Sequence, residues 1–104
     1  MPFDLVAPAK NAVLTAGEEV AYEIKLKRET LGTRRLYYMI KGDIARDGEG
    51  LRLLAAGPKG TFRIPRGLLK QDSGTLLLRV YALNAFGKLY AVDAFLQVRQ
   101  PAAK

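Results

Sequence analysis

The last third of the chain reads Thr75-Leu-Leu-Leu-Arg-Val-Tyr-Ala-Leu-Asn-Ala-Phe-Gly-Lys-Leu-Tyr-Ala-Val-Asp-Ala-Phe-Leu-Gln-Val98. In an extended chain successive side chains point to opposite faces, so every second residue shares a side. On each side of a central turn, one row is entirely apolar and the other also carries polar or charged residues. The apolar rows are Leu76, Leu78, Val80 and Ala82, and then Tyr90, Val92, Ala94, Leu96 and Val98. The alternation predicts two long strands whose apolar rows enter a core.

The segment between these strands has the composition of a short hairpin turn. It reads Asn84-Ala85-Phe86-Gly87, in which Asn can bond its own backbone and Gly can take a positive φ. After the second strand, Pro101 has no N–H to donate to a neighbouring strand. The two strands are therefore expected to pair directly as a hairpin that ends near residue 100.

The upstream sequence contains further short alternating segments separated by turn residues. We expect a first strand at 3–6 and 12–14 that is broken at Pro8, and strands at 19–27, 34–41, 51–55 and 61–64. Residues 66–74 are predicted to form one helical turn that buries Leu68 or Leu69. Together with the hairpin this makes about seven strands in a single domain over residues 1–104, the pattern of an antiparallel two-sheet sandwich. A five-stranded barrel of the oligonucleotide-binding type is the competing architecture.

The composition excludes most catalytic chemistry. The 104 residues include no cysteine and no histidine, which removes thiolate nucleophiles, imidazole bases and the usual transition-metal ligands. Ser73 lies in no glycine-framed nucleophile motif, and the acids Asp43, Asp47 and Glu49 are better explained as turn formers than as calcium ligands. We therefore expect no enzyme activity, no metal, no cofactor and no small-molecule substrate.

The beginning of the sequence has no basic segment followed by a long apolar run. We therefore expect neither a signal peptide nor membrane insertion, and a location in the cytoplasm or in a virion.

Two passages resemble the immunoglobulin-like domains of bacteria and phages, including the fibronectin type III and PKD-like variants. One passage is similar to the last strands of such domains, and the other, from Pro8 through Gly17 to the strand at Val20, is similar to their opening. The first passage comprises Thr61-Phe62-Arg63-Ile64-Pro65, Leu69, Ser73-Gly74-Thr75, Leu78, Val80, Ala82, Asn84 and Gly87. The chain departs from the pattern at Leu76, where a tyrosine is often found, and it has no tryptophan. The resemblance implies an immunoglobulin-like sandwich, and such domains share a fold without sharing a function.

Positive charge suggests one candidate site. The net charge is +7, and an excess of basic residues favours phosphates, anionic lipid or acidic proteins. The basic residues at one end of two predicted strands are Lys25, Lys27, Arg28, Arg34 and Arg35, and Tyr37 beside them is placed to stack on a base. The alternative interpretation is a solvated surface.

The outer face of the final hairpin is a second candidate site. If Leu76, Leu78 and Val80 fill the core, the other row of the hairpin faces outward. On the first strand this row contains Leu77, Tyr81 and Leu83, and Leu89, Ala91 and Phe95 of the second strand join them across the pair. The predicted interface residues are Leu77, Tyr81, Leu83 and Phe95. Contiguous apolar patches mark a protein partner or self-association, unless another part of the chain covers them.

These observations favour a non-catalytic structural or protein-binding module that docks through this hairpin face. The resemblance to phage domains suggests a capsid or tail accessory protein as its setting. The alternatives are a protein that binds nucleic acid or another polyanion through the basic residues, and a domain of a secreted or surface protein.

Overall fold

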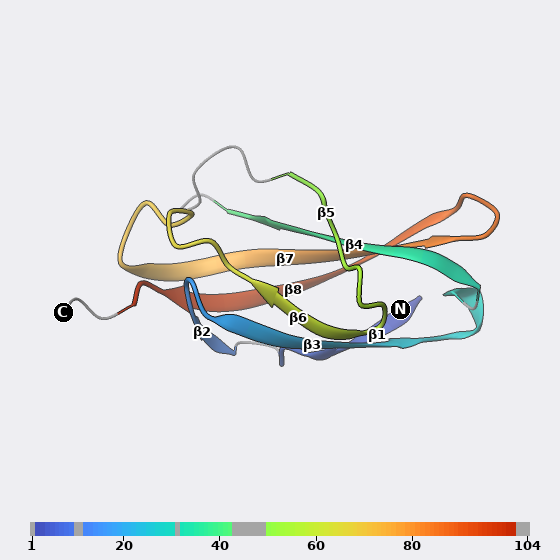
Figure 1. The fold of residues 1–104 in the computed structure, drawn as a ribbon, viewed down its shortest axis with the longest axis horizontal. Coiled ribbons are helices and arrows are strands. Elements are labelled where there is room, and N and C mark those ends of the chain that lie inside the picture. Colours follow the sequence, from blue (N-terminus) through green and yellow to red (C-terminus); the bar gives the residue numbers. More distant parts are fainter. Residues whose placement is uncertain (1, 10–11, 31, 43–49, 102–104) are drawn as a thin grey trace.

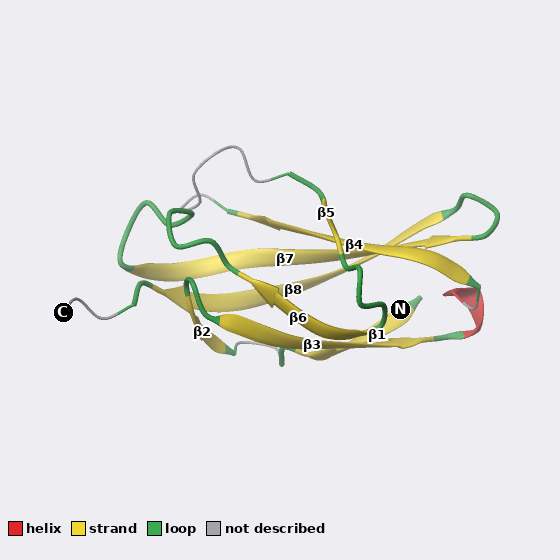
Figure 2. Ribbon diagram, viewed as in Figure 1, coloured by secondary structure: helices red, strands yellow, loops and turns green. Residues whose placement is uncertain are grey.

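The computed structural model describes residues 2–9, 12–30, 32–42 and 50–101, which form two β-sheets packed against each other (Figures 1 and 2). The three-stranded sheet has the order β1-β3-β6, and the five-stranded sheet has the order β2-β8-β7-β4-β5. The strands are β1 (Phe3–Ala7), β2 (Val13–Thr15), β3 (Glu19–Leu26), β4 (Thr33–Lys41), β5 (Arg52–Leu53), β6 (Lys59–Arg63), β7 (Ser73–Asn84) and β8 (Leu89–Arg99).

The described residues form eight strands rather than about seven, because the predicted first strand belongs to both sheets. β1 pairs with β3, whereas β2 pairs with β8 in the opposite sheet. The β2–β8 pair is parallel, unlike the other strand pairs of the described residues. The break predicted at Pro8 is therefore the point after which the chain crosses from one sheet to the other.

The predicted hairpin is the longest pairing among the described strands. β7 and β8 pair antiparallel from Ser73 opposite Arg99 to Leu83 opposite Leu89. At the turn, the Asn84 side-chain oxygen accepts hydrogen bonds from the N–H groups of Phe86 and Lys88, both at 2.9 Å. Gly87 has a φ of 83°, a conformation that glycine adopts without a side-chain clash. The predicted roles of Asn84 and Gly87 are confirmed.

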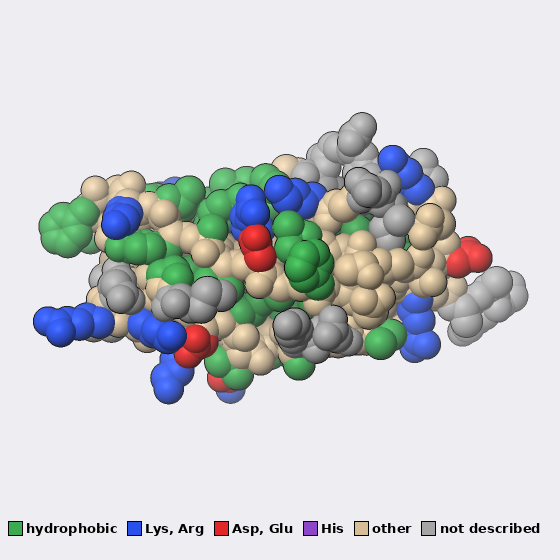
Figure 3. Space-filling model, turned by 180° about the vertical axis from the view of Figure 1, so that it is seen from behind, with side chains coloured by type: hydrophobic (Ala, Val, Ile, Leu, Met, Phe, Trp, Pro, Cys, Tyr) green, Lys and Arg blue, Asp and Glu red, His purple; other side chains and the backbone are tan. Residues whose placement is uncertain are grey.

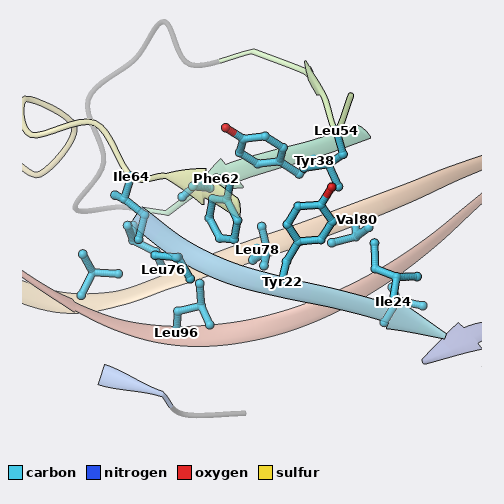
Figure 4. Packing of buried hydrophobic residues seen from close by; sticks show 14 of the residues in the cluster. Tyr22, Ile24, Tyr38, Leu54, Phe62, Ile64, Leu76, Leu78, Val80 and Leu96 are labelled. Atoms are coloured by element: carbon cyan, nitrogen blue, oxygen red, sulfur yellow. The ribbon is translucent and has the colours of Figure 1, made fainter. Parts of the chain in front are cut away.

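The core lies between the two sheets and takes side chains from both (Figure 4). The inner rows of the hairpin enter it as predicted. Tyr90 and Ala94 are half-buried, and the other members of these rows are buried, namely Leu76, Leu78, Val80, Ala82, Val92, Leu96 and Val98. An aromatic cluster joins the sheets, because Phe62 of β6 lies against Tyr22 of β3 and Tyr38 of β4. The Tyr22 hydroxyl donates a 2.6 Å hydrogen bond to the Gly57 carbonyl, and burial raises the pKa of this phenol.

One local prediction was wrong. Residues 66–72 contain turns, bends and an isolated bridge at Leu69, with no helical turn. Leu68 and Leu69 are nevertheless both buried, each only 2% exposed. The helical turn among the described residues is instead the 3-10 helix η1 (Arg28–Thr30), where a loop was expected. Burial of two consecutive leucines is compatible with an irregular segment, so their apolar character did not specify a helix.

Candidate functional site

The surface of the five-stranded sheet that points away from the core carries both apolar and charged side chains. We call this surface the outer face, and it consists of Leu77, Arg79, Tyr81 and Leu83 of β7, Leu89, Ala91, Asp93 and Phe95 of β8, and Arg35, Tyr37, Met39 and Lys41 of β4. Strand register arranges these residues in rows across the sheet. Phe95 pairs with Leu77, Ala91 pairs with Tyr81, and Leu89 pairs with Leu83. Tyr81 in turn pairs with Tyr37, which pairs with Leu53 of β5.

The four residues predicted from the sequence as a protein interface all lie on this outer face. Phe95 is 54% exposed, and Leu77, Tyr81 and Leu83 are half-buried. Leu89 was considered in the sequence only as a neighbour of the patch, yet it is also 54% exposed. Seen from behind, hydrophobic side chains gather in several clusters with basic and acidic groups between them (Figure 3). The structure thus brings the predicted interface residues together on one surface.

An ion pair crosses the middle of the outer face. The Arg79 guanidinium donates two hydrogen bonds to the Asp93 carboxylate, at 2.6 Å from Nε and 2.9 Å from Nη2. These bonds are the main reason that the pKa of Asp93 lies below its ordinary value. Burial opposes them, and the charges of Arg79 and Lys41 lower the pKa further. Hydrogen bonding to Asp93, and then to Tyr81, raises the pKa of Arg79. Arg79 and Asp93 therefore neutralise each other, whereas Arg35 and Lys41 add positive charge on β4.

Sequence reasoning did not identify this pair, although a signal for it was present. Counting outward from the Asn84–Lys88 pair that closes the turn places Arg79 opposite Asp93 in the hairpin. Opposite charges on directly facing residues stabilise a strand pair.

The three-stranded sheet presents a different surface to solvent. Its exposed side chains form charge pairs between neighbouring strands, with Arg63–Glu19 at 3.5 Å, Lys59–Glu23 at 3.7 Å and Lys27–Asp4 at 3.2 Å. Alternating opposite charges of this kind are typical of a solvated sheet face.

The predicted polyanion-binding residues do not lie on one surface. Lys25 is exposed on β3 of the three-stranded sheet, whereas Arg35 is exposed on the outer face of the opposite sheet. Lys27 pairs with Asp4, and Arg28 is exposed in η1. The side chain of Arg34 lies outside the described part of the structure. The polyanion site stays a prediction. A polyanion that bound both Lys25 and Arg35 would have to reach two sides of the molecule.

Two grooves lie at the margins of the five-stranded sheet. The first, of about 410 Å³, is lined by Leu26, by Thr33, Arg35 and Leu36 of β4, and by Leu53, Leu54, Ala55, Gly57 and Pro58. The second, of about 540 Å³, lies between β1 and β8 and is lined by Phe3, Asp4, Leu5, Pro8, Val92, Asp93, Ala94 and Phe95. The described residues contain no group of three or more acidic, histidine or cysteine side chains able to hold a metal ion. The acidic segment at Asp43, Asp47 and Glu49 lies outside the described residues.

Because of the Arg79–Asp93 pair, the free energy of unfolding is expected to fall as the pH is lowered into the acid range. Because the folded pKa of Asp93 is below its unfolded value of about 3.9, its contribution is complete above that value and is lost as pH falls through the folded pKa. We expect Asp93→Asn to be less stable than the parent near neutral pH, and we expect the difference to shrink as the solution is acidified. Urea unfolding of both proteins across this range measures it. A difference that stays constant down to about pH 2 would contradict the assignment.

Comparison with known proteins identifies the fold. No family model matches the sequence, and no curated protein matches it. A solved structure of fibronectin(III)-like modules of Clostridium thermocellum CbhA superposes with a TM-score of 0.60 at 14% sequence identity, over 95% of this chain and 46% of that one. Among the described residues, no helix is long and apolar enough to cross a membrane. The chain therefore has the all-β, immunoglobulin-like fold of fibronectin(III)-like modules, as the sequence resemblance predicted.

Proposed function

We propose that this protein is a non-catalytic structural or protein-binding module, folded as one domain over residues 1–104. Its working surface is the outer face, with Leu77, Tyr81, Leu83 and Phe95 as the contact residues. The fold supports this proposal only in a general way, because immunoglobulin-like sandwiches serve many unrelated functions. The argument therefore rests on the surface itself.

The observation that carries the proposal is the contrast between the two sheet surfaces. The three-stranded sheet faces solvent with opposite charges on neighbouring strands. On β7 and β8, the outer face instead combines aromatic and aliphatic side chains around one ion pair, with the cations Arg35 and Lys41 beside them on β4. Protein interfaces are enriched in tyrosine, phenylalanine and arginine, and their centres are poor in unpaired charge. Arg79 is bonded to Asp93, so a partner covering the β7 and β8 part of this face would bury no uncompensated charge there.

The setting we propose is a virion, in which the module serves as a capsid or tail accessory protein and associates with copies of itself or with another structural protein. The resemblance of the sequence to phage immunoglobulin-like domains supports this setting. An apolar outer face on a small sandwich is compatible with a role in assembly.

The test is to place a negative charge at contact residues of the outer face. We expect Leu83→Asp and Phe95→Asp each to abolish association through the outer face, seen in light scattering as a lower mass than that of the parent, because a carboxylate buried at an interface without a partner is strongly unfavourable. Ala21→Asp is the matched control, since Ala21 is exposed on β3 of the opposite sheet. Circular dichroism establishes that each variant is folded. Assembly that is unchanged in both outer-face variants would overturn the proposal.

Nucleic-acid binding is the alternative function, and one observation favours it. On β4, the half-buried Tyr37 lies two residues from the exposed Arg35, and the exposed Lys41 lies further along the same face. An aromatic ring near cations suits stacking on an unpaired base. Such binding would weaken with added salt and with Arg35→Ala. Absence of binding to single-stranded DNA and RNA at low salt would exclude it.

A further inference from the structure

Strand β8 has a free edge over most of its length. β7 pairs with one side of β8 along its whole length, whereas β2 pairs with the other side only from Gln97 to Arg99. Within the described ranges, no strand pairs with that side between Leu89 and Leu96.

The register identifies the backbone groups that point toward this edge. At the turn end, the Asn84 N–H bonds to the Lys88 carbonyl, so Lys88 directs its backbone toward β7. At the other end, the Gln97 N–H bonds to the Ala12 carbonyl, so Gln97 directs its backbone away from β7. Residues of an antiparallel strand alternate in this respect. The residues that present N–H and C=O groups to the free edge are therefore Leu89, Ala91, Asp93 and Phe95.

Bulges, proline, charged side chains and very short length prevent edge strands from pairing between molecules. This edge has only one of these features, the charge of Asp93, which is paired with Arg79. The β1 edge carries a register shift between Leu5 and Ala7, and β5 has only two residues. The β6 edge lies between Pro58 and Pro65 and includes Lys59 and Arg63. In contrast, residues 89–95 contain no proline and no basic residue, and their pairing with β7 shows no shift.

We propose that this edge pairs with the same edge of a second copy of the chain, antiparallel and with Val92 of one copy opposite Val92 of the other. Leu89 then pairs with Phe95 of the second copy, and Ala91 pairs with Asp93 of the second copy. Each of these pairs joins residues that point their backbone groups toward the edge, so each exchanges two backbone hydrogen bonds. The two five-stranded sheets become one continuous sheet with twofold symmetry.

The side chains in this register are complementary to themselves, which favours a second copy over an unrelated strand. The two apolar residues that are each 54% exposed, Leu89 and Phe95, meet at both ends of the new pair. Asp93 faces alanine rather than another aspartate, so no like charges are opposed. The available length also fits, because the hairpin turn of one copy begins where β2 of the other starts to cover β8.

The groove between β1 and β8 adds apolar surface beside this edge. Its lining includes Phe3, Leu5, Val92 and Phe95, and a second copy placed along the edge would cover part of it. This pairing uses the β8 edge and shares Phe95 with the proposed contact surface, but it does not involve Leu83 and Tyr81 of β7.

Disulfide trapping tests the register. The chain contains no cysteine, so Leu89→Cys and Phe95→Cys each introduce one thiol at an exposed position. Under a mild oxidant, we expect a covalent dimer when the two variants are mixed, because a hydrogen-bonded antiparallel pair has a Cα separation of about 5.5 Å. Neither variant alone should form one, since identical positions would be about 20 Å apart, six residues along the strand. A mixture of Leu83→Cys and Phe95→Cys is the matched control and should not cross-link.

A second variant separates edge pairing from partner binding at the outer face. Ala91→Pro removes an N–H that points to the free edge and leaves the bonds to β7 in place, so it should abolish the cross-link. Ala91→Thr keeps the N–H and should retain it. Leu83→Asp, which tests the outer face, should also leave the cross-link intact. Failure of the mixed pair to cross-link, or cross-linking that survives Ala91→Pro, would overturn the proposal. If the edge instead pairs with a strand of a different protein, the wild-type chain alone will sediment as a monomer, and that result would also overturn the proposal.

Discussion

Replacing Phe62 with alanine is expected to lower the free energy of unfolding by about 3–5 kcal/mol, the range for truncating a buried phenylalanine. Phe62 is 7% exposed, and its ring centroid lies 5.1 Å from that of Tyr38 and 6.4 Å from that of Tyr22. These three rings come from strands of both sheets, so the cavity would open at the contact between the layers (Figure 4). Urea denaturation followed by circular dichroism measures the change.

The control for Phe62→Ala is Phe86→Ala at the tip of the hairpin, where the side chain is 95% exposed. Because its ring contributes little buried area, this variant should unfold within about 0.5 kcal/mol of the parent. If the two variants lost similar stability, Phe62 would not hold the position in the core that the structure gives it.

The second large effect is expected at Thr30, the buried polar residue that closes one end of the sandwich. Its hydroxyl is fully buried and accepts a 3.0 Å hydrogen bond from the Lys27 N–H. It can donate its one proton to the carbonyl of Pro2 or of Lys27, each 3.1 Å away. It therefore links the start of β1 to the turn between β3 and β4. Thr30→Val preserves the shape and leaves these backbone groups without the hydroxyl, so we expect a loss of about 1–3 kcal/mol.

Thr30→Ser is the matched variant, because it keeps the hydroxyl and removes only the methyl group. We expect it to be clearly more stable than Thr30→Val in thermal and urea unfolding. If valine were tolerated better than serine, packing of the methyl group rather than hydrogen bonding would be the main contribution of this side chain.

Much of the final hairpin could be predicted because its information is local. Side chains alternate between two faces in any extended segment. When one face of the sheet packs on the core and the other meets water, the apolar row is the one that is buried. This reasoning placed Leu76, Leu78 and Val80 in the core and Leu77 and Phe95 on the other face. The same local reasoning identified Asn84 and Gly87 as turn residues. An asparagine side chain can bond the nearby backbone and glycine can take a positive φ in any fold.

Prediction was less successful where the answer depends on contacts between distant segments. Residues 66–72 contain two leucines that must be buried, and both a helical turn and an irregular loop satisfy that requirement. The basic residues Lys25 and Arg35 are close to the same turn in sequence, yet they lie on strands of different sheets and face opposite sides. Proximity in sequence therefore did not make them one patch.

The sequence by itself determined which side chains of the hairpin are buried, where the chain turns and which apolar residues are left on its outer side. Each of these follows from strand periodicity and turn chemistry, which act over a few residues. Only the tertiary structure decided that β2 covers β8 from Gln97 onward and leaves Leu89 to Phe95 as a free edge. Which strands become neighbours depends on how the two sheets pack over a common core. The alternation of side chains along one strand therefore could not predict which edge is available to a second copy.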